Sequence, residues 1–249
     1  MPAAPRGGDQ VEALATALLQ ELGWPVPLDV DRLLRAQRLE LVRRPLRAGI
    51  PGLIHLASGT IVVDSALPEP DRRLVICHEV AHAILPEHQL ALLQTPEPDL
   101  GWRQRLLLRG QANRFAAALL FGGAPDAMIA DAEPSLNAVR SLAALANAPL
   151  EAAFRRFVTR NPHRLWGLVC GARGPEAGGP RAATVAVRYA LASDRSIWCG
   201  TPQAVRLPGA PTGRVAGIRP AASEQRLIRS GARWLQWTQH PRGVLVLMT

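Results

Sequence analysis

The chain has 249 residues, of which 48% are hydrophobic and 20% are charged, so the composition is that of a globular protein rather than a disordered one. Its apolar runs end at about ten residues, which excludes a membrane span, and its first residues lack the apolar core of a secretory signal, so we expect a cytoplasmic protein without a membrane partner. The net charge of +9 comes from 29 arginines scattered along the sequence, with no lysine and no compact basic stripe, and we therefore expect no direct DNA binding.

The first third of the chain predicts two helices followed by a small sheet. Asp9 can cap a helix whose apolar residues recur at i, i+3 and i+4 and which ends at Gly23. A short helix follows over residues 29–36. Three strand-like runs come next, at residues 39–42, 53–56 and 60–64. Residues 60–64 are either an edge strand that binds an extended substrate by strand addition or an ordinary half-buried strand.

The next predicted helix begins at Asp71, ends before Pro86 and carries the pattern H-E-x-x-H at His78, Glu79 and His82. Because a helix turns once in 3.6 residues, the two imidazoles lie on one face and can hold one zinc ion at about 2.1 Å. Glu79 beside them can act as base for a zinc-bound water, whose pKa the metal brings to about 7. The alternative is a buried polar cluster that hydrogen-bonds internally, which is costly without a metal or close partners.

A second signature lies downstream, on a long helix. Residues 86–100 are rich in proline and predict a loop with a short turn at 90–93, and the helix follows over residues 101–121. This helix carries the run A-N-R-F-A-A-A-L-L, beginning at Ala112. The pairing of H-E-x-x-H-A-I-L with A-N-x-F-A-A-x-L-L closely resembles the ImmA/IrrE family of bacterial metallopeptidases, over about residues 60–160.

The resemblance implies an α+β fold, with a zincin-like peptidase domain over residues 1–133 and a helix-turn-helix-like segment over residues 134–161. Residues 162–249 then resemble, by the order of their elements, a small α/β GAF-like domain. The expected helices after the long one span residues 126–130, 135–146 and 150–158. The expected strands of the last domain span residues 165–171, 183–191, 196–199, 233–238 and 243–248.

The same resemblance implies a function and its residues. A member of this family is expected to be a zinc-dependent endopeptidase that cleaves a helix-turn-helix transcriptional repressor in a stress or mobile-element response. His78 and His82 would hold the zinc, and Glu79 would deprotonate the water that attacks the scissile bond.

The third zinc ligand is the open position in this site. The family places a glutamate four residues before the Asn of its second motif, and this chain has Arg109 there, which cannot bind a metal. His88 lies six residues after His82, the ligand spacing of metzincins, although Leu85 stands where those proteins have a glycine. The alternatives are a solvated loop histidine at position 88, or a ligand from Glu97 or Asp99. The site predicted from the sequence is therefore His78, His82 and His88 around zinc, with Glu79 as base.

Arg109 also supports a second interpretation. If the glutamate has been lost without a replacement, the chain is a pseudopeptidase that keeps the fold and the substrate groove and acts as a regulatory protein-binding module. Zinc content distinguishes the two, because a pseudopeptidase would purify with less than one zinc per chain.

Overall fold

The computed structural model describes residues 7–95, 97–171, 182–193, 204–208, 212–216, 234–240 and 243–248. The described residues form two compact units. The N-terminal unit runs to Pro125 and includes residues 145–149, and the C-terminal unit contains residues 126–144 and the chain from Leu150 onward. The predicted three-part division at residues 133 and 161 stays a prediction about domains, and the compact units group the helices after residue 126 mostly with the C-terminal sheet.

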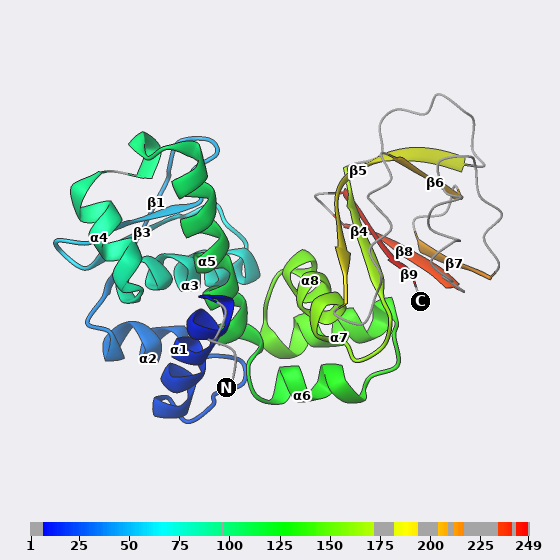
Figure 1. The fold of residues 1–249 in the computed structure, drawn as a ribbon, viewed down its shortest axis with the longest axis horizontal. Coiled ribbons are helices and arrows are strands. Elements are labelled where there is room, and N and C mark those ends of the chain that lie inside the picture. The colour runs from blue at the N-terminus through cyan, green and yellow to red at the C-terminus, as the bar shows by residue number, and fades with distance from the viewer. Residues whose placement is uncertain are drawn as a thin grey trace, which may run out of the picture. The chain divides into compact units, whose positions relative to one another are not determined.

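The N-terminal unit is a mixed α+β structure in which helices α1, α3 and α5 pack together beside a small sheet (Figure 1). Its elements are α1 (Gly7–Glu21), α2 (Val30–Ala36), β1 (Glu40–Arg44), β2 (Gly52–His55), β3 (Thr60–Asp64), α3 (Glu69–Ile84), α4 (Pro86–Gln94), the short 3-10 helix η1 (Glu97–Asp99) and α5 (Trp102–Phe121). Their apolar faces meet in a core that includes Val80 of α3 and Phe115 of α5, both fully buried. This core holds the H-E-x-x-H helix against α5, which is the packing that positions the site.

The small sheet has the strand order β1-β3-β2, with β3 parallel to β1 and antiparallel to β2. Residues 60–64 are therefore the central strand, and of the two alternatives for this segment the substrate-binding edge strand was wrong. The reason lies in their composition, since Ile61, Val62 and Val63 are all buried, as in a strand that is covered on both faces. Among the described residues the edge strands of this sheet are β1 and β2.

The H-E-x-x-H helix begins two residues earlier than predicted, after Pro68 and with a proline in its first turn. It ends as predicted, because Leu85 before Pro86 has φ −73° and ψ 118°, outside the helical region. Pro86 then begins α4, which corrects the prediction of a loop over residues 86–100. A proline at the first helical position has the correct φ and needs no hydrogen-bond donor there, so the residue that stops α3 also starts α4. Asp9 lies inside α1 rather than at its cap.

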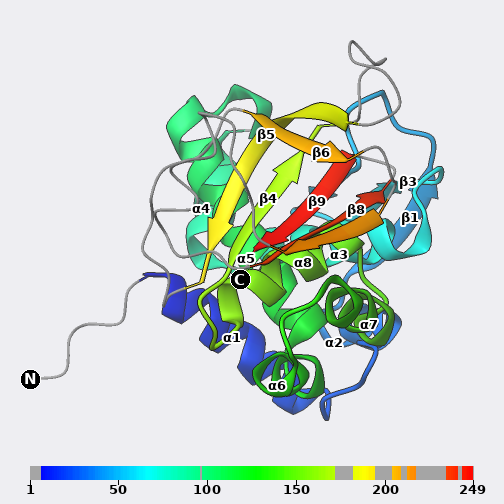
Figure 2. The same cartoon turned by 90° about the vertical axis from the view of Figure 1, so that its right-hand side faces the viewer.

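The C-terminal unit contains a six-stranded sheet of order β6-β5-β4-β9-β8-β7, in which every neighbouring pair is antiparallel (Figure 2). Its elements are α6 (Ala124–Asp131), α7 (Leu136–Ala146), α8 (Leu150–Arg160), β4 (Trp166–Cys170), β5 (Ala182–Ala192), β6 (Ala204–Pro208), β7 (Thr212–Ala216), β8 (Trp234–His240) and β9 (Gly243–Met248). Helix α8 packs on β4 and β5. The sequence prediction missed β6 and β7, and the strand predicted at residues 196–199 lies outside the described residues.

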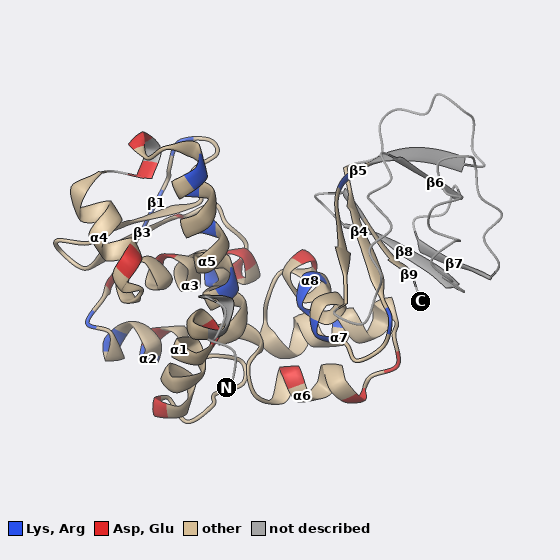
Figure 3. Cartoon of the chain, viewed as in Figure 1, with Lys and Arg blue, Asp and Glu red and all other residues tan. Residues whose placement is uncertain are grey.

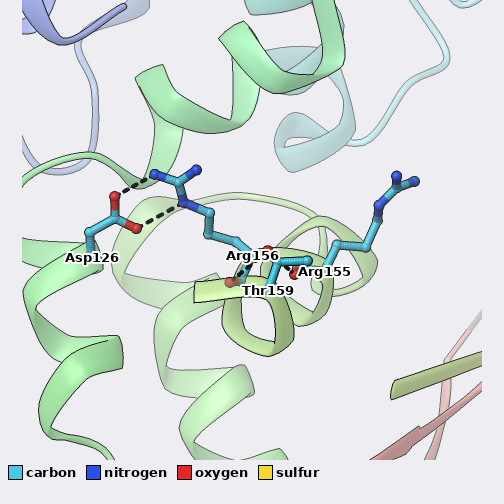
Figure 4. Close-up of polar contacts among 4 residues, drawn as sticks. All are labelled: Asp126, Arg155, Arg156 and Thr159. Carbon is cyan, nitrogen blue, oxygen red and sulfur yellow. Dashed lines mark hydrogen bonds and ion pairs between the residues drawn. The ribbon is translucent and has the colours of Figure 1, made fainter. Parts of the chain in front are cut away.

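The arginines of α8 make contacts within the protein itself. Arg156 is 7% exposed and donates from its guanidinium to both carboxylate oxygens of Asp126, with its Nε 2.8 Å from Oδ1 (Figure 4). Thr159 donates to the carbonyl of Arg155, one turn back on the same helix. The guanidinium of Arg155 lies 5.0 Å from the centre of the Tyr189 ring. Two neighbouring basic residues of the helix-turn-helix-like segment are thus used for packing inside the unit.

Among the described residues, no helix combines the length and the apolar character that crossing a membrane requires.

Candidate metal centre

The two histidines of the H-E-x-x-H motif meet through their Nε2 atoms, as the helical spacing predicts. His78 and His82 lie one turn apart on α3, their ring centres are 5.0 Å apart, and their Nε2 atoms are separated by 3.3 Å. Glu79, between them in sequence, is 6% exposed. The structure therefore brings the imidazoles of His78 and His82 together, with Glu79 next to His78 on the same helix.

Each of these imidazoles has a partner at its other nitrogen. The Nδ1 atom of His78 lies 2.9 Å from Oδ1 of Asn113 on α5, and an amide oxygen is an acceptor, so the proton of His78 is on Nδ1. The Nδ1 atom of His82 lies 2.9 Å from Nδ1 of His88, on the first turn of α4. Asn113 is the Asn of the second motif. Its contact with His78 links this motif on α5 to the H-E-x-x-H motif on α3.

His88 is fully buried and lies behind His82. Its Nδ1 faces the Nδ1 of His82, and its Nε2 is 3.0 Å from Oε1 of Gln111. Both of its ring nitrogens are therefore directed away from the paired Nε2 atoms of His78 and His82. The ligand role of His88 stays a prediction that these contacts do not support.

The Nε2 pair fits a zinc ion. Two nitrogens bound at about 2.1 Å and separated by a tetrahedral angle lie about 3.4 Å from one another, close to the 3.3 Å between the Nε2 atoms of His78 and His82. In the described part of the chain, no three His, Cys, Asp or Glu side chains lie close enough together to hold a metal ion. The pair therefore has no third protein ligand among these residues.

Arg109 and Glu97 form an ion pair near the histidines. The Nε of Arg109 lies 3.2 Å from Oε1 of Glu97, and the Arg109 side chain is 55% exposed. Figure 3 shows the basic residues of α5 in blue, with no acidic residue anywhere on that helix. The positive charge of Arg109 acts on His78, Glu79 and His82, so it lies within electrostatic reach of the whole motif.

Burial is the main influence on the protonation of the site. Burial, together with smaller contributions from neighbouring histidines and Arg109, lowers the pKa of His78 to about 4 and that of His82 to about 3, and the hydrogen bond to Asn113 partly opposes the change at His78. Both imidazoles are therefore neutral at pH 7, which is the form that binds a metal. Burial and, to a smaller extent, the charge of Glu97 raise the pKa of Glu79 to about 8, and Arg109 opposes the rise. A cation beside Glu79 would favour its ionised form.

The raised pKa of Glu79 predicts how the stability of the metal-free protein depends on pH. Glu79 holds its proton up to about pH 8 in the fold but only to about 4.5 in the unfolded chain, so the folded state binds the extra proton between these values. The contribution of Glu79 to the free energy of unfolding is fully present below pH 4.5. It decreases as the pH rises toward 8, by up to about 1.4 kcal/mol per pH unit. We expect Glu79→Gln to remove this loss, so that the variant gains stability relative to the wild type as the pH rises.

Urea unfolding in the presence of a chelator, at several pH values between about 5 and 8, measures this difference. The histidines of the site titrate in the opposite sense and are present in both proteins, so the comparison separates Glu79 from them. Glu69→Gln, at an exposed carboxylate of the same helix that is ion-paired with Arg72, is the control for loss of a charge away from the site. A pH-independent difference between wild type and Glu79→Gln would contradict the raised pKa.

The edge strand β2 passes beside Glu79. A Cβ atom on Gly52 would clash with the side chain of Val75 and would lie 3.5 Å from Oε1 of Glu79. Glycine at this position therefore allows β2 to approach α3 at the functional carboxylate. The sequence alone did not single out Gly52 or Gln111 as residues of the site. The only sequence signal for Gly52 was a glycine at the start of a strand, directly after Pro51.

An α+β unit in which an H-E-x-x-H helix packs against a second helix, beside a small sheet, has the features expected of an H-E-x-x-H metallopeptidase domain. Residues 41–157 match the family model Peptidase_M78 and form an IrrE N-terminal-like domain. The resemblance drawn from the two sequence motifs is thereby confirmed. The match ends at residue 157 and so does not reach the C-terminal sheet.

One similar solved structure is described as a Mycobacterium tuberculosis transcriptional regulator. It is 16% identical to this chain with a TM-score of 0.50, and the match covers 74% of this chain and 55% of that one. At this identity the similarity concerns the fold alone, and this chain corresponds to about half of that structure's length. The comparison with curated proteins gives no match.

Proposed function

We propose that this protein is a zinc-dependent endopeptidase in which Nε2 of His78 and Nε2 of His82 hold the metal and Glu79 is the general base. The observation that carries the proposal is the pair of Nε2 atoms 3.3 Å apart. Asn113 accepts the Nδ1 proton of His78, so the Nε2 of that ring has a free lone pair aimed at its neighbour. Two neutral imidazoles in this position fit a bound cation, and family membership supports zinc as that cation.

Zinc bound at this site supplies a Lewis acid that polarises the scissile carbonyl and makes water nucleophilic at neutral pH. The Glu79 carboxylate takes a proton from the attacking water and later gives it to the leaving amine nitrogen. The low exposure of Glu79 keeps bulk water away from this proton transfer. Strand β2 can pair with an extended segment of substrate and hold the scissile bond beside Glu79, because Gly52 brings its backbone close to that carboxylate.

The substrate we propose is a helix-turn-helix transcriptional repressor, cleaved in the cytoplasm to release stress or mobile-element genes. The family assignment over residues 41–157 supports a peptidase, and the solved structure of similar fold is itself described as a transcriptional regulator. For the C-terminal unit we propose a GAF-like role as a sensor or structural support. Its antiparallel sheet places the first strand, β4, beside the last, β9, with α8 on β4 and β5. An experimental structure of this unit without GAF-type helices would overturn that part.

Zinc uptake tests the proposed site directly. We expect the wild type to bind one zinc ion per chain, and His78→Ala and His82→Ala each to weaken binding by at least about 100-fold, because each removes one nitrogen of the pair. Competition with a chromophoric chelator, together with elemental analysis, measures affinity and stoichiometry. His163→Ala removes an exposed histidine of the C-terminal unit and should change neither. Equal affinity in all four proteins would contradict the assignment.

Arg109 favours a second candidate function, that of a pseudopeptidase acting as a regulatory protein-binding module. It occupies the position of the family's glutamate ligand, and no third ligand joins the pair among the described residues. In this case the edge strand β2 would bind a partner without cutting it. A protein that purifies with clearly less than one zinc per chain and leaves every repressor intact would support this function over proteolysis.

A further inference from the structure

A row of hydrogen bonds runs from the back of His82 to the surface of the N-terminal unit. It passes from His82 to His88, from His88 to Gln111 and from Gln111 to Glu87. We propose that His88 is a positioning residue, which together with Gln111 and Glu87 holds His82 in the tautomer whose Nε2 is free to bind a metal. The inference rests on the proposed function, in which His82 is a zinc ligand, and it assigns His88 a different role from the ligand expected from sequence spacing.

The direction of the hydrogen bonds follows from Gln111. Its amide nitrogen donates to Oε2 of Glu87 over 3.3 Å, since a carboxylate oxygen accepts. The amide oxygen of Gln111 is therefore the atom 3.0 Å from Nε2 of His88, and an oxygen there requires a proton on that nitrogen. The position of the proton on His88 is thus set by the two residues that follow it in the row.

The proton on Nε2 of His88 determines which nitrogen of His82 carries a proton. His88 is 0% exposed, so a second proton and the charge it brings would be costly, and the Nδ1 of a singly protonated ring must accept. The donor 2.9 Å away is then Nδ1 of His82. With its proton on Nδ1, His82 has its lone pair on Nε2, the nitrogen that lies 3.3 Å from Nε2 of His78.

Asn113 acts on His78 in the same way as His88 acts on His82. Its carbonyl oxygen accepts the Nδ1 proton of His78 at 2.9 Å, so both rings present bare Nε2 atoms to one another. Two facing lone pairs repel each other unless a cation lies between them, so partners that enforce this arrangement favour metal binding. In metal sites such partners fix the ring orientation of the ligand, and their loss typically costs about 10–100-fold in metal affinity.

The chain path explains why the six-residue spacing serves this purpose. Leu85 leaves the helical region and Pro86 starts a new helix at once, so the chain does not turn back toward Nε2 of His82. His88 instead lies in the first turn of α4, where its backbone N–H donates to the backbone carbonyl of Leu85. This places the imidazole of His88 beside the Nδ1 edge of His82, between α3 and Gln111 of α5.

Zinc affinity in a matched set of variants tests the proposal. We expect His88→Leu to weaken zinc binding by about 10–100-fold. His88→Gln should restore most of it, because a glutamine can accept from His82 with its oxygen and donate to Gln111 with its amide. Gln111→Ala, at a half-buried position, should weaken binding less than His88→Leu, and Gln104→Ala on the exposed face of the same helix should have no effect. If His88→Gln binds zinc as weakly as His88→Leu, the positioning role is overturned.

Two spectroscopic measurements on the wild type test the same proposal. They need neither an activity assay nor a folded variant. Nitrogen-15 NMR of the metal-free protein should show protons on Nδ1 of His78, Nδ1 of His82 and Nε2 of His88. X-ray absorption of the zinc-loaded protein should count two imidazoles on the metal. A proton on Nε2 of His82, or three imidazoles on zinc, would overturn the inference. A wild type with the expected tautomers that binds no zinc would instead contradict the proposed function.

Discussion

Glutamine at position 79 is expected to abolish cleavage of the substrate while leaving the zinc site intact. Glu79 is not one of the paired ligands, so its replacement by an isosteric amide keeps His78 and His82 in place. An amide cannot take a proton from water, and loss of a general base typically costs about 10²–10⁴-fold in rate. Cleavage of a panel of helix-turn-helix repressors from the same genome, followed on gels with zinc-loaded protein, measures this effect.

The control for this experiment is Glu69→Gln, which removes an exposed carboxylate at the start of the same helix and should cleave at the wild-type rate. Zinc content must be measured in each protein, so that loss of metal is separated from loss of the base. Undiminished cleavage by Glu79→Gln would contradict the mechanism. A wild type that holds zinc but cuts no repressor would favour the pseudopeptidase.

The parts of the fold that could be predicted from sequence are those with a local cause. The spacing of His78 and His82 depends only on the helical repeat, and the end of α3 depends only on Pro86. The long helix α5 was predicted to within one residue of its start, because a run rich in helix formers, interrupted only by Gly110, lies between Gly101 and Gly122. Both helices lie within residues 41–157, the range that the family model matches.

The parts that could not be predicted depend on contacts between distant segments. Whether a strand is central or at an edge is decided by its partners, and the pairing of β3 with both β1 and β2 is not visible in its own five residues. Residues 86–94 were predicted as a loop because proline is usually counted as a breaker, although it is well suited to a first helical turn. Strands β6 and β7 contain proline and glycine, which weaken a strand pattern.

The contacts at the site illustrate the same limit. The sequence showed that His88 has the spacing of a ligand, but the direction in which its ring points depends on the start of α4 and on Gln111, 23 residues further along. Gly52 lies 27 positions before Glu79, and its importance appears only where β2 crosses α3. Spacing along one helix could therefore be read from sequence, whereas roles set by packing between elements could not.

Glutamate at position 109 is expected to increase zinc affinity by about 100-fold or more, which corresponds to about 2.7 kcal/mol. Arg109 lies four residues before Asn113, whose amide contacts His78, and its charge acts on all three residues of the motif. A positive charge there disfavours a dication, so Arg109→Glu removes a repulsion and adds a carboxylate that can become the third ligand. Competition titrations with a chelator measure the gain.

Two further variants separate the contributions to this gain. Arg109→Ala removes the repulsion without adding a ligand, and also releases Glu97 from its ion pair, so it should increase zinc affinity by about tenfold or less. Arg103→Glu makes the same change of charge on the same helix, at a residue whose guanidinium lies 5.3 Å from the ring centre of Trp102, and should change affinity little.

The difference between Arg109→Glu and Arg109→Ala decides where the third ligand comes from. A clearly higher zinc affinity for Arg109→Glu than for Arg109→Ala means that position 109 faces the Nε2 pair, and that arginine occupies the position of a third ligand in the natural protein. Equal affinities mean that a carboxylate at position 109 does not reach the metal. In the first case Arg109→Glu should also increase the rate of repressor cleavage, because a third ligand keeps the metal in place through turnover. Arg109 therefore links metal affinity and catalytic competence, the two properties that separate a working peptidase from a binding module.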